Sequence, residues 1–130
     1  MATPRRAGWI PVRIDLHTWA QEIERYREGA APRLAAERER RRLEQDGVRI
    51  PVLQRCSVEG VDGTSLGGLV KVYVPISDAP ASERPYGFVL IPTREGVLAL
   101  VAFGERHPVA GTRSVYERAH KRLHGRYPDQ

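Results

Sequence analysis

The sequence has little cysteine and no long hydrophobic run. Cys56 is the one cysteine among 130 residues, so no disulfide can form within the chain and no thiolate cluster can hold a metal. A protein that folds without disulfides suits a reducing compartment, and we expect it in the cytoplasm. No apolar stretch reaches the length of a membrane span, and no signal-peptide core follows the polar first residues. We therefore expect a protein that does not interact with membranes.

Lysine is scarce too, because only Lys71 and Lys121 represent it among the 21 basic residues. With 16 acidic residues, the formal net charge is +5 and the isoelectric point is about 9.9. A guanidinium binds a phosphate through two parallel hydrogen bonds and stacks on bases, so this composition favours a nucleic-acid partner. A genome rich in G and C, which encodes arginine in place of lysine, would produce the same bias.

The order of hydrophobic patterns predicts one α+β domain over residues 1–130, with residues 1–8 as a flexible tail. Sequential strands with short links favour an antiparallel-rich, four-stranded sheet, with two helices before most of it and one after it, all on one face. The expected strands cover 9–14, 69–74, 86–91 and 97–103, the expected helices cover 15–29, 32–45 and 112–124, and a partly extended segment covers 48–56.

The second expected helix is charged on every side. Residues 33–46 carry five arginines against three glutamates and one aspartate. Such a helix is first a solvated face, and only second a ridge that can follow nucleic-acid phosphates.

The last third of the sequence gathers groups that suit a phosphodiester. The runs 86–91 and 97–103 form a hairpin, and its exit places Arg106 and His107 beside a helix that carries Tyr116. Guanidinium, imidazole and phenol groups near the end of a sheet can hold a phosphate and move a proton.

Four segments, in this order along the chain, resemble the RelE/ParE superfamily of bacterial toxins. Residues 68–73 form a Gly-Leu turn into a strand with a lysine, and residues 86–90 form a strand that begins with an aromatic residue. Residues 98–107 form an aliphatic strand followed by basic residues, and residues 115–123 form a closing helix with a Val-Tyr start. The order of strands and helices over residues 9–124 is also that of the superfamily.

The resemblance implies the toxin of a type II toxin–antitoxin system, a small RelE/ParE-like fold that pairs with an acidic antitoxin. RelE-like members are ribosome-dependent endoribonucleases (mRNA interferases): they cleave mRNA with the RNA's own 2′-hydroxyl, leave a cyclic phosphate, and so inhibit translation and arrest growth. This chemistry needs a base, an acid and cations around the phosphorane, and the resemblance implies no cofactor. ParE-like members act on DNA gyrase and need none of these groups. A noncatalytic toxin-fold protein and a basic nucleic-acid-binding protein are therefore the alternatives.

The resemblance assigns catalytic roles to particular residues. Arg106 matches the arginine after the last strand, as a phosphate clamp. Tyr116 matches the tyrosine at the helix start, where it orients the 2′-hydroxyl or stacks on a base, and Lys71 matches the strand lysine approximately. To these we add His107, which is not a superfamily residue, because an imidazole exchanges protons near neutral pH.

The sequence departs from the superfamily at Gly87, where an arginine is common. Arg84, in the preceding loop, is a candidate substitute. The densest basic segment, residues 105–126, has six Arg and Lys against two Glu and can follow RNA phosphates. The expected nucleic-acid-binding residues are Arg84, Arg113, Arg118, Lys121 and Arg122.

Each of these groups also has a structural interpretation. A strand lysine such as Lys71 is more often a solvated edge residue, and Tyr116 can fill the gap between helix and sheet. The basic C-terminal segment can be the solvated face of a helix. His120 and His124 are spaced to share a metal, but no third ligand lies near them in the sequence, so we expect no metal site.

Overall fold

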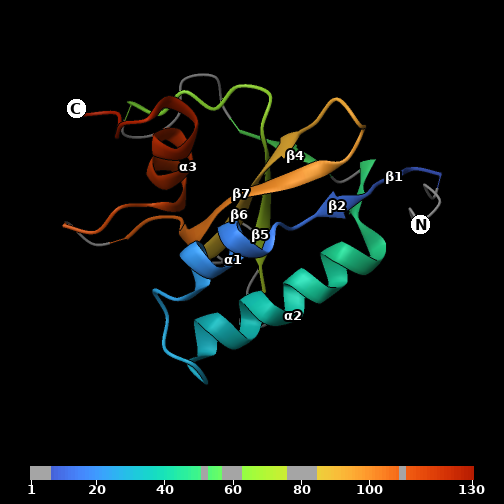
Figure 1. The fold of residues 1–130 in the computed structure, drawn as a ribbon, viewed down its shortest axis with the longest axis horizontal. Helices are drawn as coiled ribbons and strands as arrows, with labels where there is room; N and C mark the ends of the chain where they lie inside the picture. The colour runs from blue at the N-terminus through green and yellow to red at the C-terminus, as the bar shows by residue number, and fades with distance from the viewer. Residues whose placement is uncertain (1–6, 51–52, 57–62, 76–84, 109–110) are drawn as a thin grey trace.

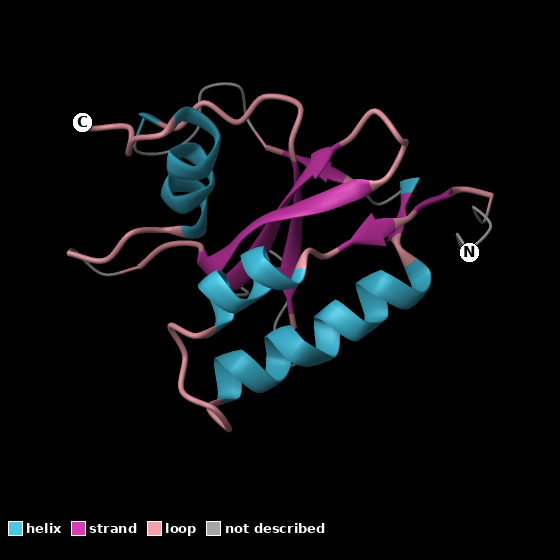
Figure 2. Ribbon diagram, viewed as in Figure 1, coloured by secondary structure: helices cyan, strands magenta, loops and turns pink. Residues whose placement is uncertain are grey.

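The computed structural model describes residues 7–50, 53–56, 63–75, 85–108 and 111–130 (Figure 1). Over these residues the fold is α+β, as the sequence predicts, with three helices, a five-stranded sheet and a two-stranded ribbon (Figure 2). The helices are α1 (Leu16–Ile23), α2 (Ala31–Asp46) and α3 (Val115–His124). The strands are β1 (Trp9–Ile10), β2 (Val12–Arg13), β3 (Val48–Arg49), β4 (Gln54–Arg55), β5 (Val70–Val74), β6 (Tyr86–Pro92) and β7 (Leu98–Glu105).

The larger sheet has the strand order β2-β7-β6-β5-β4. β2 runs parallel to β7, and the other neighbours are antiparallel. The prediction of four strands was wrong, because β4 adds a fifth strand to this sheet. The first expected strand is also split at Pro11, which has no backbone N–H to donate. As a result β1 pairs with β3 in a separate ribbon while β2 joins β7. The segment 48–56, expected to be only partly extended, supplies β3 and β4.

Helices cover both faces of the larger sheet. Successive residues of a strand point to opposite faces, and Phe88 and Val89 of β6 illustrate this. Phe88 packs in the core that contains Leu43 of α2, whereas Val89 packs with Ala119 of α3. The prediction that all helices lie on one face was wrong, because the central strands are apolar at successive positions and both faces need a cover.

α1 ends earlier than the sequence predicts. Asp15 caps its start, as expected, and the helix stops at Ile23 rather than near Gly29. The backbone N–H of Tyr26 donates to the Ile23 carbonyl at 3.0 Å, which closes a tighter turn. The Tyr26 ring then packs edge-on against Phe103, with 5.3 Å between the ring centroids. Contact with the sheet therefore draws the chain out of the helix.

α3 has strong signals at both ends. The Ser114 hydroxyl accepts a hydrogen bond from the Glu117 backbone, and the Glu117 carboxylate accepts one from the Ser114 backbone, so the two residues form a capping box. The box fixes the first helical residue as Val115, three positions after the expected start at residue 112. Gly125 ends the helix in the left-handed conformation, with φ of 81°.

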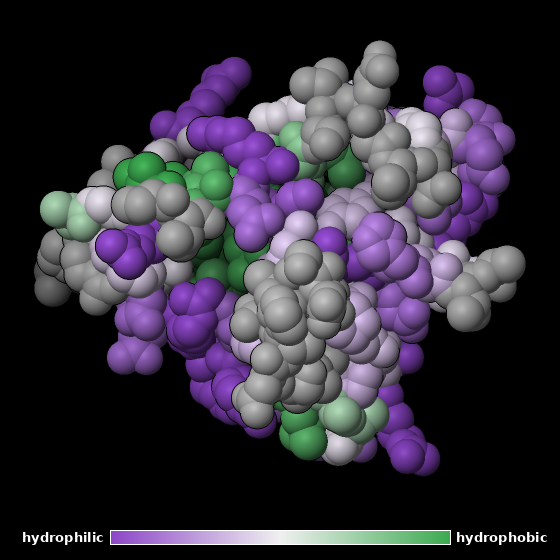
Figure 3. Space-filling view, turned by 180° about the vertical axis from the view of Figure 1, so that it is seen from behind, coloured by the Kyte–Doolittle hydropathy of each residue, from purple (hydrophilic) through white to green (hydrophobic). Residues whose placement is uncertain are grey.

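The charges of α2 pair along the helix itself. The ion pairs are Arg33–Glu37 (3.2 Å), Arg40–Glu44 (2.7 Å) and Arg42–Glu39. Such pairs suit a helix with one solvated face. Seen from behind, the described surface is mostly hydrophilic, with hydrophobic residues in smaller patches (Figure 3).

Candidate functional site

Lys71 and Tyr73 lie on the face of the sheet that α3 covers. They alternate along β5 with Val70 and Val74, which belong to the core on the opposite face. Lys71 lies opposite Val89 of β6, and Val89 packs beneath α3. Both polar residues are half-buried.

Gly87 makes room for Arg106 on this face. It pairs with Tyr73 of the neighbouring strand. A Cβ at position 87 would lie 3.2 Å from the carbonyl oxygen of Val72 and 3.5 Å from Cγ of Arg106. The stem of Arg106 therefore crosses the sheet where a side chain is missing. Its backbone N–H donates to the Pro85 carbonyl at 2.7 Å, which fixes the residue at the exit of β7.

Arg106 contacts two tyrosines from different elements. Its guanidinium carbon lies 3.8 Å from the centroid of the Tyr73 ring, a cation–π arrangement. Its Nε donates to the hydroxyl of Tyr116 on α3 at 3.3 Å. The Lys71 ammonium lies 5.7 Å from the centroid of the same Tyr73 ring. We call Lys71, Tyr73, Arg106 and Tyr116 the Arg106 cluster.

The cluster has a buried side and an accessible side. Arg106 is 7% exposed and Tyr116 is 8% exposed, whereas Lys71 and Tyr73 are half-buried. His107, the next residue along, is exposed. Only Lys71 and Tyr73 of the cluster therefore present substantial side-chain surface to a ligand. Arg84, the expected substitute for the superfamily arginine, lies outside the described residues.

The sequence analysis did not consider Tyr73, although a signal was present. Tyr73 follows Lys71 by two residues in a confident strand, and residues two apart in a strand share a face. A tyrosine at this position is expected to contact the same groups as Lys71.

A second charged group, Glu22 of α1, is fully buried and holds two of the expected nucleic-acid-binding residues. Arg118 of α3 donates to both of its carboxylate oxygens, at 3.1 and 2.5 Å. Arg122 donates to Oε2 at 3.0 Å, and the Phe103 N–H of β7 donates to Oε1 at 3.1 Å. Arg25, which follows the end of α1, lies 3.9 Å from Oε1 of Glu22. We call Glu22, Arg25, Arg118 and Arg122 the Glu22 cluster.

The protonation of Glu22 follows from this surrounding. Burial on its own raises the pKa of the Glu22 carboxyl, but the hydrogen bond and charge of Arg118 outweigh it, helped by the Phe103 N–H and Arg25, so the pKa is lowered. The sequence offered one signal for this residue. Glu22 falls among the apolar residues Trp19, Ile23 and Tyr26 at helical spacing, a position where a carboxylate needs a partner.

The remaining expected nucleic-acid-binding residues also have partners. Arg113 donates to both carboxylate oxygens of Asp129, at 2.9 and 3.3 Å, and to Glu117 at 2.9 Å. These hydrogen bonds, that of Asp129 first, raise the pKa of Arg113. The Arg113 guanidinium also lies 4.1 Å from the Tyr127 ring centroid, and the Lys121 ammonium lies 4.6 Å from it. The basic segment thus forms intramolecular contacts along α3 and the residues after it.

The histidines and the cysteine have structural surroundings. His120 Nδ1 accepts from the Ser65 N–H at 3.0 Å, and His124 Nε2 lies 3.1 Å from the Ser65 carbonyl oxygen, so the two rings hold one backbone segment. Across the part of the chain that the structure describes, no group of three or more His, Cys, Asp or Glu residues could hold a metal. Burial raises the pKa of the Cys56 thiol, an effect that the charge of Lys71 opposes. A raised pKa disfavours the reactive thiolate.

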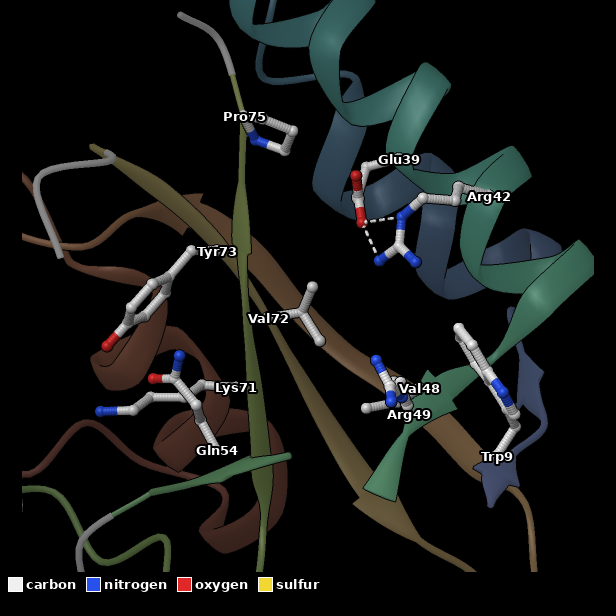
Figure 4. Close-up of a pocket in the computed structure, with 10 residues that line it drawn as sticks. All are labelled: Trp9, Glu39, Arg42, Val48, Arg49, Gln54, Lys71, Val72, Tyr73 and Pro75. Carbon is white, nitrogen blue, oxygen red and sulfur yellow. Dashed lines mark hydrogen bonds and ion pairs between the residues drawn. The ribbon is translucent and has the colours of Figure 1, made fainter. Parts of the chain in front are cut away.

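A hollow of about 400 Å³ lies beside β5, between the β1–β3 ribbon and α2 (Figure 4). Val72 points into it, while Lys71 and Tyr73 point to the other side of the strand (Figure 4). Arg42 and its partner Glu39 stand on the α2 wall, and the hollow reaches the edge of β5 at Lys71 and Tyr73. The hollow and the Arg106 cluster therefore meet at one strand.

Comparison of this chain with protein-family models, with curated protein sequences and with solved structures finds no match. Among the described residues, no helix is long and apolar enough to cross a membrane. The two charged clusters and the hollow are therefore the features that bear on function.

Proposed function

We propose that this chain is the toxin of a type II toxin–antitoxin system and cleaves mRNA on the ribosome. The observation that supports the proposal is the Arg106 cluster. A strand lysine and an arginine after the last strand lie over one tyrosine ring, and the arginine donates to the hydroxyl of a tyrosine at the start of the final helix. The lysine, the arginine and the helix tyrosine are the residues that the resemblance to RelE-like enzymes assigns to catalysis.

The proposed reaction is an internal transesterification of RNA. The 2′-oxygen attacks the adjacent phosphorus and loses its proton to a base. The bond from phosphorus to the 5′-oxygen breaks, and that oxygen takes a proton from an acid. The products are a 2′,3′-cyclic phosphate and a 5′-hydroxyl end, and no oxidant, reductant or metal is needed to balance the reaction.

The geometry distributes the roles among the side chains. Lys71 is half-buried, so its ammonium can meet a non-bridging phosphate oxygen directly. Arg106 is buried and an arginine does not readily deprotonate, so it supplies positive charge from beneath and holds the Tyr116 hydroxyl. His107 follows Arg106 and is exposed, and we assign the proton transfer to its imidazole.

The net charge of +5 suits both partners of such a toxin, the mRNA on the ribosome and an acidic antitoxin. A cytoplasmic location follows from this proposal, because ribosomes and mRNA are the targets.

The test is to induce the chain in bacteria and to map new mRNA 5′ ends, with a parallel reaction on purified translating ribosomes. Arg106→Ala should lower the cleavage rate by about 10²–10³, the loss expected when one preorganised donor is removed. Lys71→Ala should lower the cleavage rate by a similar factor. This variant should disturb folding less than Arg106→Ala, because Lys71 is only half-buried. Arg94→Ala, an exposed arginine in the turn before β7, is the matched control. Unchanged rates in both cluster variants would remove the cluster from the mechanism.

The low exposure of Arg106 and Tyr116 favours a second candidate, a noncatalytic toxin-fold protein that inhibits a protein target such as DNA gyrase. In that case the cluster only holds α3 on the sheet. Growth arrest with DNA breaks and without mRNA cuts would select this candidate. Binding to nucleic acid without growth arrest would instead select a basic nucleic-acid-binding protein.

A further inference from the structure

We propose that the hollow beside β5 is a contact site for single-stranded RNA, and that it leads the strand around the edge of β5 to the Arg106 cluster. One part of the inference rests on the proposed function, namely that the RNA strand leads from the hollow to a phosphate that reacts at the Arg106 cluster. The hollow itself is separate from the residues to which the resemblance assigns catalysis, apart from Lys71.

An aromatic and a cationic side chain lie next to each other at this hollow. Trp9 of β1 and Arg49 of β3 are directly paired across the ribbon, so the indole and the guanidinium share one region of its surface. Trp9 is half-buried and Arg49 is exposed. Figure 4 shows both at the hollow, with Val48 behind them. Proteins that bind single-stranded nucleic acids combine such aromatic surfaces, on which bases stack, with cations that follow the phosphates.

The opposite wall carries an ion pair with no net charge. Arg42 and Glu39 of α2 form an ion pair in which Glu39 is 5% exposed, while the Arg42 side chain is 45% exposed. Because this pair is neutral, the charge of Arg49 makes the hollow net positive. Gln54 of β4 borders the hollow at the edge of β5, and its exposed side chain lies beside Lys71 (Figure 4).

The edge of β5 connects the hollow with the Arg106 cluster. Among the described residues, β4 pairs with Val70 and Lys71 at one end of β5, and Tyr73 lies two residues further along the same strand. Tyr73 and Lys71 line the hollow, and their side chains point toward Arg106 on the other face. A strand of RNA that leaves the hollow over this edge meets Lys71 next.

The experiment measures binding of a fluorescein-labelled 2′-O-methyl oligouridylate of about ten nucleotides, a length within the range of single-stranded sites. This strand has no free 2′-hydroxyl and cannot be cleaved. Trp9→Ala and Arg49→Ala should each weaken binding by roughly fivefold to tenfold. Arg49→Ala should also reduce the slope of log affinity against log salt by about 0.7, the value for one phosphate contact on a single strand.

Two further variants make the result specific. Arg94→Ala removes the same charge from the turn between β6 and β7 and should leave affinity unchanged. Trp9→Phe keeps an aromatic ring and should retain affinity, while the quenching of tryptophan fluorescence by the strand should fall, because only Trp19 remains. Circular dichroism checks that each variant is folded.

Several outcomes would overturn the inference. Equal affinity in Trp9→Ala, Arg49→Ala and Arg94→Ala would remove the hollow as an RNA site. Absence of any binding by the unaltered chain would do the same, and binding of an acidic protein in place of the strand, lost in the same variants, would make the hollow a protein-docking site.

Failure of this inference and failure of the proposed function are distinguishable. Strand binding through Trp9 and Arg49 without cleavage on ribosomes would reject the nuclease and leave the binding site. Cleavage that depends on Arg106, with full strand affinity in both hollow variants, would reject the site alone.

Discussion

Two buried charged groups attach α3 to the rest of the molecule, and they do so by different chemistry. Glu22 is surrounded by arginines, and its carboxylate cancels much of the charge that Arg118 and Arg122 bring to the helix. Arg106 is held by the Tyr73 ring and the Tyr116 hydroxyl. Both of these contacts are with uncharged groups, so they position the guanidinium and neither of them neutralises it.

The difference indicates which basic residues serve the fold and which can serve a ligand. Removing a cation from a buried carboxylate destabilises a protein, so the pairs of Arg118 and Arg122 with Glu22 contribute to the fold. A cation stacked on a ring keeps its field and can still act on a phosphate nearby. Sequence alone gives the same weight to all of these arginines.

The largest expected effect comes from breaking the Glu22 cluster. Glu22→Ala leaves three arginines without their common carboxylate and should lower the free energy of unfolding by about 3–5 kcal/mol, measured by urea denaturation. Glu95→Ala is the control, since its pair with Arg13 is solvent-exposed and should be worth less than about 1 kcal/mol. A loss for Glu22→Ala no larger than that of the control would show that the cluster contributes little.

The pH dependence of stability should give the second largest effect, and it should distinguish the Glu22 cluster from the Arg106 cluster. The pKa of Glu22 in the folded protein lies below its ordinary value of 4.5, so in acid the unfolded chain takes up its proton first. Its contribution is therefore complete above pH 4.5 and is lost as the pH falls through the lowered pKa. Urea denaturation at a series of acidic pH values should show this slope, and Glu22→Gln should flatten it because it has no carboxyl there. An equal slope in the variant would assign the effect to other carboxylates.

The aromatic contact of Arg106 should be worth less. Tyr73→Leu keeps an apolar side chain but removes the ring, and should cost about 1–2 kcal/mol of unfolding free energy, the range for a partly desolvated cation–π contact. Tyr127→Leu is a suitable comparison, because that ring carries Arg113 and Lys121 at the surface and should cost less. Equal losses would argue against a special role for the Tyr73 ring.

The smallest expected effect tests the space that Arg106 occupies. Gly87→Ala places a methyl group 3.2 Å from a backbone oxygen and should cost about 1 kcal/mol, since the backbone must shift. Gly104→Ala is matched, because Gly104 pairs with Gly87, but its new methyl would meet the movable end of Arg25 at 3.1 Å. Thermal unfolding should place Gly104→Ala nearer the unaltered protein. The reverse order would mean that the β5 backbone yields more easily than Arg25.

Local signals in the sequence predicted the local structure well. The final helix was expected to end at Gly125, and it does so in the left-handed conformation that favours glycine. The β6–β7 hairpin was expected from two apolar runs joined by a polar turn, and it places Arg106 within reach of Tyr116. These features depend on neighbours in the chain, which a pattern of residue types can describe.

Features that depend on distant partners could not be predicted in the same way. The pairing of Glu22 with Arg118 brings together α1 and α3, and nothing in either helix specifies the other. The central strands are apolar on both faces, and that pattern does not say which helix covers which face. The split of the first strand at Pro11 required knowing that β1 would find β3.

The parallel pairing of β2 with β7 also bears on how the chain folds during synthesis. Val12 lies beside Leu98, so this edge of the sheet can close only after Leu98 has been synthesised. Contacts between residues so distant in sequence slow folding, because a long loop has to be closed before they form. A nascent copy of this protein therefore pairs β2 with its sheet only once β7 has emerged, and Arg106, Arg118 and Arg122 are synthesised after that strand.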